Sequence, residues 1–338
     1  MRFLLLPLSY LYGAIGALRN MLYDRGIFKS YQSRLKTLVI GNLQVGGSGK
    51  TPMTAWLYGY LSPHYSTAIL SRGYGRSTRG LLVADKQSSA DSIGDEPLWY
   101  YQHLPNAQVV VSEKRQLGLQ YLETTSTELV LLDDAFQHRA ITANVYLMLS
   151  EYSRPYYNDY PMPYGRLREF RHGVKRAHGI IISKCPAELS LEEKIAMIKA
   201  INPDEHQSVF FTGLKADKPV ALKGSAAFDI RNFDRIIALS GIASPASFHA
   251  FCHSFGLPVE VQAYGDHHQY TATEIQALLK QLTARTCILC TEKDAVKLSA
   301  PVLSTLWPDN LLFSLPVQPY FLFEEEDKFK RFLKAHQL

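Results

Sequence analysis

The stretch that most constrains how this chain folds is residues 37–52, which read TLVIGNLQVGGSGKTP. An apolar, β-branched run predicts a strand, a glycine-rich loop follows, and Lys50-Thr51 leads into a helix expected over Pro52–Leu61. This order is typical of a phosphate-binding loop, in which backbone N–H groups and a helix N-terminus hold anionic oxygens. We therefore predict that Lys50 binds the β- and γ-phosphates of a nucleotide and that the Thr51 hydroxyl binds Mg²⁺.

The loop departs from the strict motif at two positions. The strict pattern has a glycine where this chain has Gln44, and loops of the related deviant type often have a signature lysine where this chain has Val45. A glycine-rich turn without chemical function is the alternative, but the strand before the loop and Lys50-Thr51 after it argue against that interpretation. The predicted nucleotide-binding residues are Val45, Gly46, Gly47, Ser48, Gly49, Lys50, Thr51 and Pro52.

Length and composition fit a globular enzyme of two domains. The chain has 338 residues, of which 46% are hydrophobic and 20% charged. A net charge of +5 suits anionic ligands or an acidic membrane surface, and it is too small to predict nucleic-acid binding. Cys287 and Cys290 lie three residues apart in an expected strand, so their side chains point to opposite faces. We expect all four cysteines to be reduced thiols of a cytosolic protein rather than metal ligands.

The N-terminal segment is first apolar and then basic. Residues 3–18 carry no charge, but they fall short of the roughly 20 residues that a spanning helix needs, and Pro7 interrupts them. Apolar residues recur at helical spacing between Leu11 and Leu22, and cations dominate from Arg19 to Lys36. We therefore expect a helix that lies in an anionic membrane interface. A signal peptide and a helix docked on the core are the alternatives, and a nucleotide-binding loop argues against export.

Strands and helices alternate along most of the chain. This alternation predicts an α/β protein with a P-loop NTPase-like, mostly parallel sheet domain, a second, smaller α/β domain and the N-terminal interface helix. The expected division is residues 1–30 for the membrane-associated helical segment, 31–220 for the P-loop domain and 221–338 for the smaller C-terminal domain. The boundary is placed in the connector KADKPVALKGS, residues 215–225.

Charged residues follow several of the expected strands. An apolar run from residue 129 ends in Asp133-Asp134, which is typical of a Walker B strand whose carboxylates lie near Mg²⁺. Such acids are costly to bury unpaired, so a metal or a basic partner is expected. Arg72 ends another strand in the motif SRGYGR, which suits either an anionic ligand or a solvated turn. Asp95, in GDEP, lies near a helix start, where capping alone would explain one acid.

Seven motifs in one order resemble those of the tetraacyldisaccharide 4′-kinases. They are VGGSGKTP (45–52), SRGYGR (71–76), GDEP (94–97), LDDAFQHR (132–139), PYGRLRE (163–169), DHH (266–268) and TEKD (291–294). The resemblance implies an ATP- and Mg²⁺-dependent kinase that phosphorylates the 4′-hydroxyl of a tetraacylated glucosamine disaccharide 1-phosphate, forming lipid IV-A in lipid A biosynthesis. It also implies a monotopic protein on the cytoplasmic face of the inner membrane. The resemblance does not imply an oligomer.

The resemblance further implies roles for individual residues. Asp95 would be the catalytic base toward the sugar hydroxyl, assisted by His267, with the adjacent His268 as an alternative, and Lys50 would complete the catalytic set. The implied metal ligands are Thr51, Glu96, Asp133 and Asp134. The implied substrate-binding residues are Arg72, Tyr74, Arg115, Gln137 and Arg168. TEKD is also similar to a base-reading motif of GTP-binding proteins, but here we expect it to close a strand of the second domain.

Other functions account for only part of the sequence. A deviant P-loop ATPase, such as a switch or a metallochaperone, would be a dimer and would usually have a lysine in place of Val45. A soluble small-molecule kinase gives no reason for the apolar N-terminus and the cations after it. A membrane-tethered binding protein with an inactive loop would not need Lys50-Thr51 and Asp133-Asp134 intact.

Overall fold

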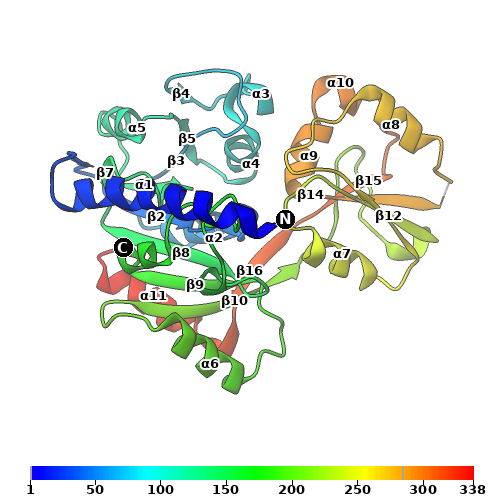
Figure 1. Ribbon diagram of the computed structural model, residues 1–338. Coiled ribbons are helices and arrows are strands. Elements are labelled where there is room, and N and C mark those ends of the chain that lie inside the picture. The colour runs from blue at the N-terminus through cyan, green and yellow to red at the C-terminus, as the bar shows by residue number, and fades with distance from the viewer. Residues whose placement is uncertain (1, 284) are drawn as a thin grey trace.

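The computed structural model describes residues 2–283 and 285–338. Figure 1 shows a larger body built on a twisted sheet with helices on both faces, and a smaller body beside it. The chain therefore has the α/β architecture with mostly parallel sheets that the sequence predicts.

The large domain is built on a nine-stranded sheet in the order β16-β10-β9-β8-β2-β6-β3-β5-β4. Strands β10 to β5 in this order run parallel, and the edge strands β16 and β4 pair antiparallel with their neighbours. The strands are β2 (Lys36–Asn42), β3 (Thr67–Ser71), β4 (Leu82–Val83), β5 (Gln108–Val111), β6 (Leu129–Asp133), β8 (Val145–Glu151), β9 (Gly179–Ser183), β10 (Ser208–Ala216) and β16 (Val317–Phe321). A separate short ladder joins β1 (Tyr31–Gln32) to β7 (Ile141–Thr142).

Helices cover both faces of this sheet (Figure 1). They are α2 (Lys50–Leu61), α3 (Ala90–Ile93), α4 (Asp95–His103), α5 (Arg115–Leu122), α6 (Leu191–Ile201) and α11 (Glu326–Ala335), with short 3₁₀ turns at Tyr156–Asn158 and Arg171–Arg176. Leu38 and Ile40 of β2 face one core cluster, and Val39 between them faces the other. Because both faces are covered, the central strands are continuous apolar runs, which explains why the sequence reveals them.

The smaller domain has a five-stranded sheet in the order β11-β15-β14-β12-β13. Its elements are β11 (Val220–Ala221), a 3₁₀ turn (Ile230–Asn232), β12 (Arg235–Ser240), α7 (Ala246–His253), β13 (Val259–Ala263), α8 (Ala272–Leu279), β14 (Thr286–Thr291), α9 (Glu292–Leu298), α10 (Pro301–Ser304) and β15 (Leu312–Leu315). Cys287 and Cys290 of β14 belong to the core clusters on opposite faces of this sheet, and all four cysteines are free and buried. The expected opposite orientation of this pair is confirmed.

The end of the chain returns to the large domain, which corrects the expected assignment of residues 221–338 as a whole to the smaller one. Strand β16 pairs with β10, and α11 buries Phe329 and Leu333 in a core cluster of the large sheet. The Phe329 ring packs edge-on against Phe210 of β10, with centroids 4.9 Å apart. The expected assignment was wrong because the apolar face of α11 is buried against the large sheet near β10. The chain thus crosses between the domains twice, from β10 to β11 and from β15 to β16.

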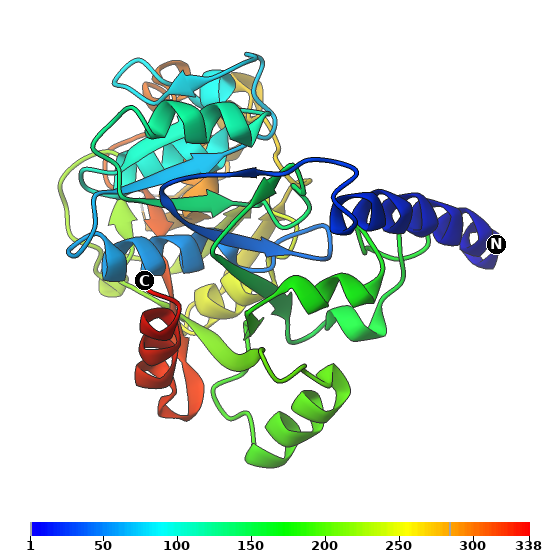
Figure 2. The same cartoon turned by 90° about the vertical axis from the view of Figure 1, so that its left-hand side faces the viewer.

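Helix α1 (Leu6–Asp24), preceded by a 3₁₀ turn (Arg2–Leu5), stands off the large domain with the N-terminus at its outer end (Figure 2). Its inner side is fixed by small residues: a Cβ on Gly13 would lie 2.6 Å from the Phe170 ring, and the Ser9 hydroxyl accepts a hydrogen bond from the Tyr164 amide at 2.8 Å. The predicted apolar stripe points outward, because Leu11 and nearby side chains are more than half exposed. Among the described residues, no helix is long and apolar enough to cross a membrane.

We expect Phe329→Ala to destabilise the large domain by about 3–5 kcal/mol, because the ring is fully buried and its loss leaves a cavity. Denaturant unfolding followed by fluorescence measures this change. Val302→Ala, at a position that is 75% exposed in the smaller domain, is the matched control. Equal stability of the two variants would contradict the return of α11 to the large core.

Candidate active site

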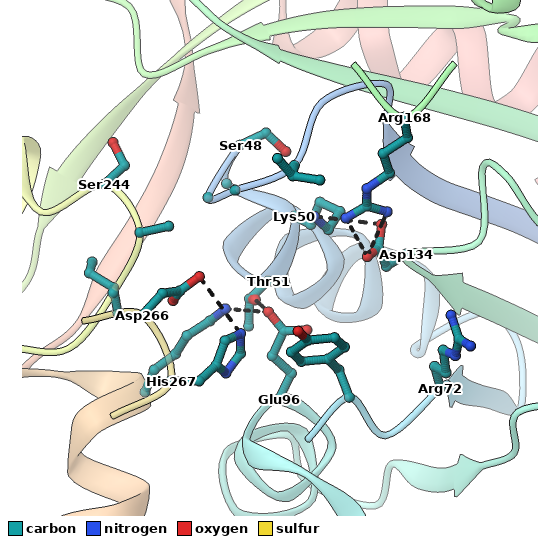
Figure 3. A pocket seen from close by; sticks show the side chains of 18 of the residues that line it. Ser48, Lys50, Thr51, Arg72, Glu96, Asp134, Arg168, Ser244, Asp266 and His267 are labelled. Atoms are coloured by element: carbon teal, nitrogen blue, oxygen red, sulfur yellow. Dashed lines mark hydrogen bonds and ion pairs between the residues drawn. The ribbon is translucent and has the colours of Figure 1, made fainter. Parts of the chain in front are cut away.

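A cavity of about 890 Å³ lies where the large domain, the smaller domain and α1 meet. The phosphate-binding loop forms one wall, and residues of the loop before α7, of the loop before α8 and of α9 form another. Figure 3 shows Lys50, Thr51, Glu96 and Asp134 converging on this space from the large domain, with Asp266 and His267 facing them from the smaller domain.

The phosphate-binding loop joins β2 to α2, in the order of strand, loop and helix that the sequence predicts. Gly46 and Gly49 have φ values of +110° and +81°, in the region that favours glycine, and α2 begins directly after the loop at Lys50. The Lys50 ammonium lies 3.4 Å from Asn42 Oδ1 and 3.6 Å from Asp134 Oδ1. Ser183 donates a hydrogen bond of 2.8 Å to the Ser48 carbonyl oxygen, which braces the loop against the end of β9. The free N–H groups at the start of α2 provide an anion site.

The two aspartates after β6 have different surroundings. Asp134 receives three hydrogen bonds from Arg168, one at 2.9 Å and two at 3.1 Å. Burial opposes the ionisation of Asp134, but Lys50 and then Arg168 outweigh burial and lower its pKa. Asp133 is buried, and burial, followed by repulsion from Glu96, raises its pKa to about 7. Ser71 donates to its Oδ2 at 3.3 Å, whereas its Oδ1 is buried and has no hydrogen-bond partner among the described residues.

The unpartnered oxygen of Asp133 fits a divalent cation or its water, because a buried carboxylate oxygen needs a positive or donating neighbour. The Thr51 hydroxyl, which donates to Glu96 at 3.3 Å, supplies a further oxygen of the kind Mg²⁺ takes. The described residues contain no cluster of three His, Cys, Asp or Glu placed to hold a metal by themselves. A Mg²⁺ ion here would therefore also need phosphate oxygens and water, as is usual for this ion.

Glu96 and Asp95, at the start of α4, are each paired with a lysine of α9. Glu96 forms an ion pair with Lys293; burial opposes the ionisation of Glu96, but Lys293 and then Lys50 outweigh it and lower its pKa. Lys297 lies one helical turn further along and contacts Asp95 Oδ2 at 3.0 Å, with 4% and 7% of the two side chains exposed. These two ion pairs join the domains directly beside the phosphate-binding loop.

His267 lies between Asp95 and the cavity. Its Nδ1 is 3.2 Å from Asp95 Oδ2, its Nε2 is 3.9 Å from Asp266, and its ring packs against Tyr74 with centroids 5.0 Å apart. Burial opposes ionisation of Asp95, but the hydrogen bond from His267 and the charge of Lys297 outweigh burial and lower its pKa.

The adjacent His268 faces away from this site. Its Nε2 lies 3.1 Å from Glu274, and its ring stacks on Tyr264 with centroids 4.3 Å apart, inside the smaller domain. Of the two histidines, the structure therefore brings His267 to the aspartate of GDEP.

All five expected substrate-binding residues line the cavity, but they differ in exposure and in their hydrogen-bond partners. Arg72 and Tyr74 are exposed on the cavity wall, whereas Arg115 is buried and donates to backbone oxygens of Ser112 and Asp133 at 2.9 and 3.2 Å. Burial lowers the pKa of Arg115 to about 10. Gln137 donates to the Asn42 carbonyl at 2.8 Å and accepts from Arg168 at 3.3 Å.

Sequence reasoning missed the two lysines of α9, although Lys293 lies inside the motif TEKD. Thr291 of the same motif caps α9, because its hydroxyl accepts a hydrogen bond from the Asp294 amide at 3.2 Å. The Asp294 carboxylate accepts from that hydroxyl at 2.6 Å and from the Gly241 amide at 3.0 Å, so it supports the cap and holds a neighbouring loop. The spacing of Lys293 and Lys297 by four residues was the available signal, because it places both on one helix face.

We expect Lys297→Met to lower the free energy of unfolding by about 3–5 kcal/mol, because the Asp95 carboxylate stays buried without its lysine. Adding Asp95→Asn should recover part of this loss, since no uncompensated charge remains. Denaturant unfolding of both single variants and the double variant measures the coupling. Lys199→Met, on the exposed surface of α6, is the control; purely additive losses would contradict a direct ion pair.

Comparison with known proteins agrees with this geometry. The sequence profile described as LpxK, tetraacyldisaccharide-1-P 4′-kinase, matches residues 1–337. A tetraacyldisaccharide 4′-kinase of Flavobacterium psychrophilum is 38% identical over 97% of this chain and 94% of its own length. That of Phocaeicola vulgatus is 34% identical over 96% of this chain and 92% of its own length.

A solved structure is similar over the whole chain. It is LpxK from Aquifex aeolicus, described as an "apo" form in complex with ATP, with a TM-score of 0.77, 29% sequence identity and 99% coverage of both chains. Together with the family profile over residues 1–337, these similarities show that the chain belongs to the tetraacyldisaccharide 4′-kinase family.

Proposed function

We propose that this protein transfers the γ-phosphoryl group of ATP to the 4′-hydroxyl of tetraacyldisaccharide 1-phosphate, which yields lipid IV-A and ADP. The observation that carries the proposal is that one cavity is lined both by a phosphate-binding loop and by His267, whose ring contacts the buried Asp95. The first suits a nucleotide donor, and the second suits a hydroxyl acceptor. Family membership supports the same reaction.

The donor side acts mainly through positioning and charge. The backbone of residues 46–50 and the N-terminus of α2 hold the phosphates, and Lys50 exchanges its contact with Asp134 for the β- and γ-phosphate oxygens. Thr51, Glu96, Asp133 and Asp134 are the residues that would hold Mg²⁺, with the unpartnered Asp133 Oδ1 as its clearest support. When bound, Mg²⁺ supplies positive charge to the phosphate oxygens.

On the acceptor side, the His267–Asp95 pair takes the proton of the 4′-hydroxyl as the O4′–Pγ bond forms and the bond from Pγ to the ADP oxygen breaks. Asp95 lies behind His267, so it orients the imidazole and stabilises its positive charge. Asp95 is supplied by α4 of the large domain and His267 by the smaller domain, so the pair is complete only when the domains are in contact. Arg72, Arg168 and Tyr74 are the cavity residues that we assign to the anionic acceptor.

The lipid acceptor implies an interface with the inner membrane at its cytoplasmic face. The exposed stripe of α1 supports this assignment, because a helix that shows Leu8 and Leu11 to solvent gains free energy by entering a lipid interface. Tyr12, Ile15 and Arg19 of the same helix line the cavity. A sugar headgroup at the membrane surface would therefore lie beside the phosphate-binding loop.

We expect Lys50→Ala and Asp95→Asn each to lower kcat/KM by about 10²–10⁴-fold. The assay uses ATP, Mg²⁺ and tetraacyldisaccharide 1-phosphate, and mass spectrometry follows the gain of one phosphate. Lys86→Ala, at an exposed loop lysine, should retain normal turnover. Failure of the unaltered protein to phosphorylate this lipid would reject the proposed function, and near-normal turnover of Asp95→Asn would remove that residue from the reaction.

We expect Leu8→Glu with Leu11→Glu to weaken binding to anionic phospholipid vesicles by about tenfold or more, because two apolar side chains no longer enter the interface. Co-sedimentation with the vesicles measures the bound fraction. Val302→Glu, on the exposed surface of α10, is the control. Unchanged binding of the double variant would contradict the interface role of α1.

A further inference from the structure

Lys184 is a largely buried lysine on the cavity wall that the proposed reaction does not use. It follows directly after β9, at the edge of the sheet where the phosphate-binding loop lies, and 10% of its side chain is exposed. Its backbone has φ +56°, a left-handed conformation that is unfavourable for a residue with a long side chain. Such strain persists only where the surroundings hold it, and it is frequent at binding sites.

The ammonium group of Lys184 points toward the phosphate-binding loop. Its Nζ lies 4.0 Å from the place that a Cβ on Gly47 would occupy, and the preceding Ser183 holds the Ser48 carbonyl. Gly47 is exposed, so the space between the loop and Lys184 belongs to the cavity. Lys184 thus faces the middle of the loop, whereas Lys50 lies at the loop's end.

A single carboxylate of the described protein balances the charge of Lys184. Its Nζ is 3.5 Å from Glu151 Oε1 at the end of β8, and the Ser244 hydroxyl donates to the same oxygen at 3.0 Å. Burial lowers the pKa of Lys184, and the positive charges of Lys293 and Arg154 lower it further. The negative charge of Glu151 raises the pKa but does not offset the lowering. An ammonium in this position gains from any additional anion that enters the cavity.

We propose that Lys184 is a second nucleotide-binding lysine, which contacts a phosphate oxygen of ATP held by the phosphate-binding loop, and that Glu151 is its partner when no nucleotide is bound. The inference rests on the proposed binding of ATP at this loop. It also accounts for Val45, which stands where loops of the deviant type often have a lysine. Here Lys184, which follows directly after β9, supplies an ammonium group to the loop from another part of the same chain.

The alternative is that Lys184 and Glu151 form a purely structural ion pair, and the two interpretations make opposite predictions for Glu151. If the pair is structural, removing either partner perturbs the site in the same direction. If Lys184 binds phosphate, removing Glu151 takes away both its competing partner and a negative charge close to the nucleotide, so affinity stays equal or rises.

The test is titration calorimetry of the full chain with a non-hydrolysable ATP analogue and Mg²⁺. We expect Lys184→Gln to raise the Kd about 10- to 100-fold, the range for a hydrogen bond to a charged group. Lys184→Arg should recover most of the affinity, because it keeps the charge. Glu151→Gln should leave the Kd unchanged or lower it. Lys199→Gln, on exposed α6, is the control, and thermal unfolding verifies that each variant is folded.

Two outcomes would overturn the inference: a Kd of Lys184→Gln within twofold of the unaltered protein, or equal weakening by Lys184→Gln and Glu151→Gln. If Lys184→Gln does not fold, Lys184→Arg and Glu151→Gln still test the inference. Weaker nucleotide binding by Glu151→Gln would contradict a phosphate-binding role of Lys184. Lys50→Gln separates this inference from the proposed function. If Lys50→Gln abolishes binding while Lys184→Gln does not affect it, the ATP site stands and the role of Lys184 fails.

Discussion

The structure depends on keeping several buried or half-buried carboxylates charged at the carboxyl edge of the large sheet. Asp95, Glu96 and Asp134 have lowered pKa values although burial opposes their ionisation, because a lysine, an arginine or a histidine contacts each one. The Asp133 carboxylate forms no ion pair within the described part of the chain, and its pKa is raised to about 7. The difference separates acids that the protein itself neutralises from one that favours an added cation.

The same charge pairing joins the two domains. Lys293 and Lys297 reach from α9 to the first two residues of α4, and Ser244 reaches from the loop before α7 to Glu151. The smaller domain therefore contacts the phosphate-binding side and the acceptor side of the cavity through separate polar links. Because the two crossing connections, residues 217–219 and Pro316, are short, a movement of the smaller domain would break or remake these contacts together.

Much of the fold could be predicted because buried parallel strands leave an unambiguous apolar pattern, as in residues 38–40 and 129–132. The order strand, glycine loop and Lys50-Thr51 likewise predicted the loop between β2 and α2 that lines the cavity. The destination of α11 could not be predicted, because an amphipathic helix shows that one face is buried and not which sheet buries it. The roles of Lys184, Lys293 and Lys297 were missed for a related reason: lysines on a helix or after a strand are usually solvated.

The sequence by itself determined the local chemistry: a loop shaped for phosphate, acids at strand ends, and an apolar helix with cations after it. It determined these because backbone conformation and residue type act over a few neighbouring residues. Only the tertiary structure decided which distant charges meet, such as Lys297 with Asp95, and that His267 rather than His268 faces the cavity. Those choices depend on contacts between residues about 170 to 200 positions apart, and the relative placement of two domains fixes such contacts.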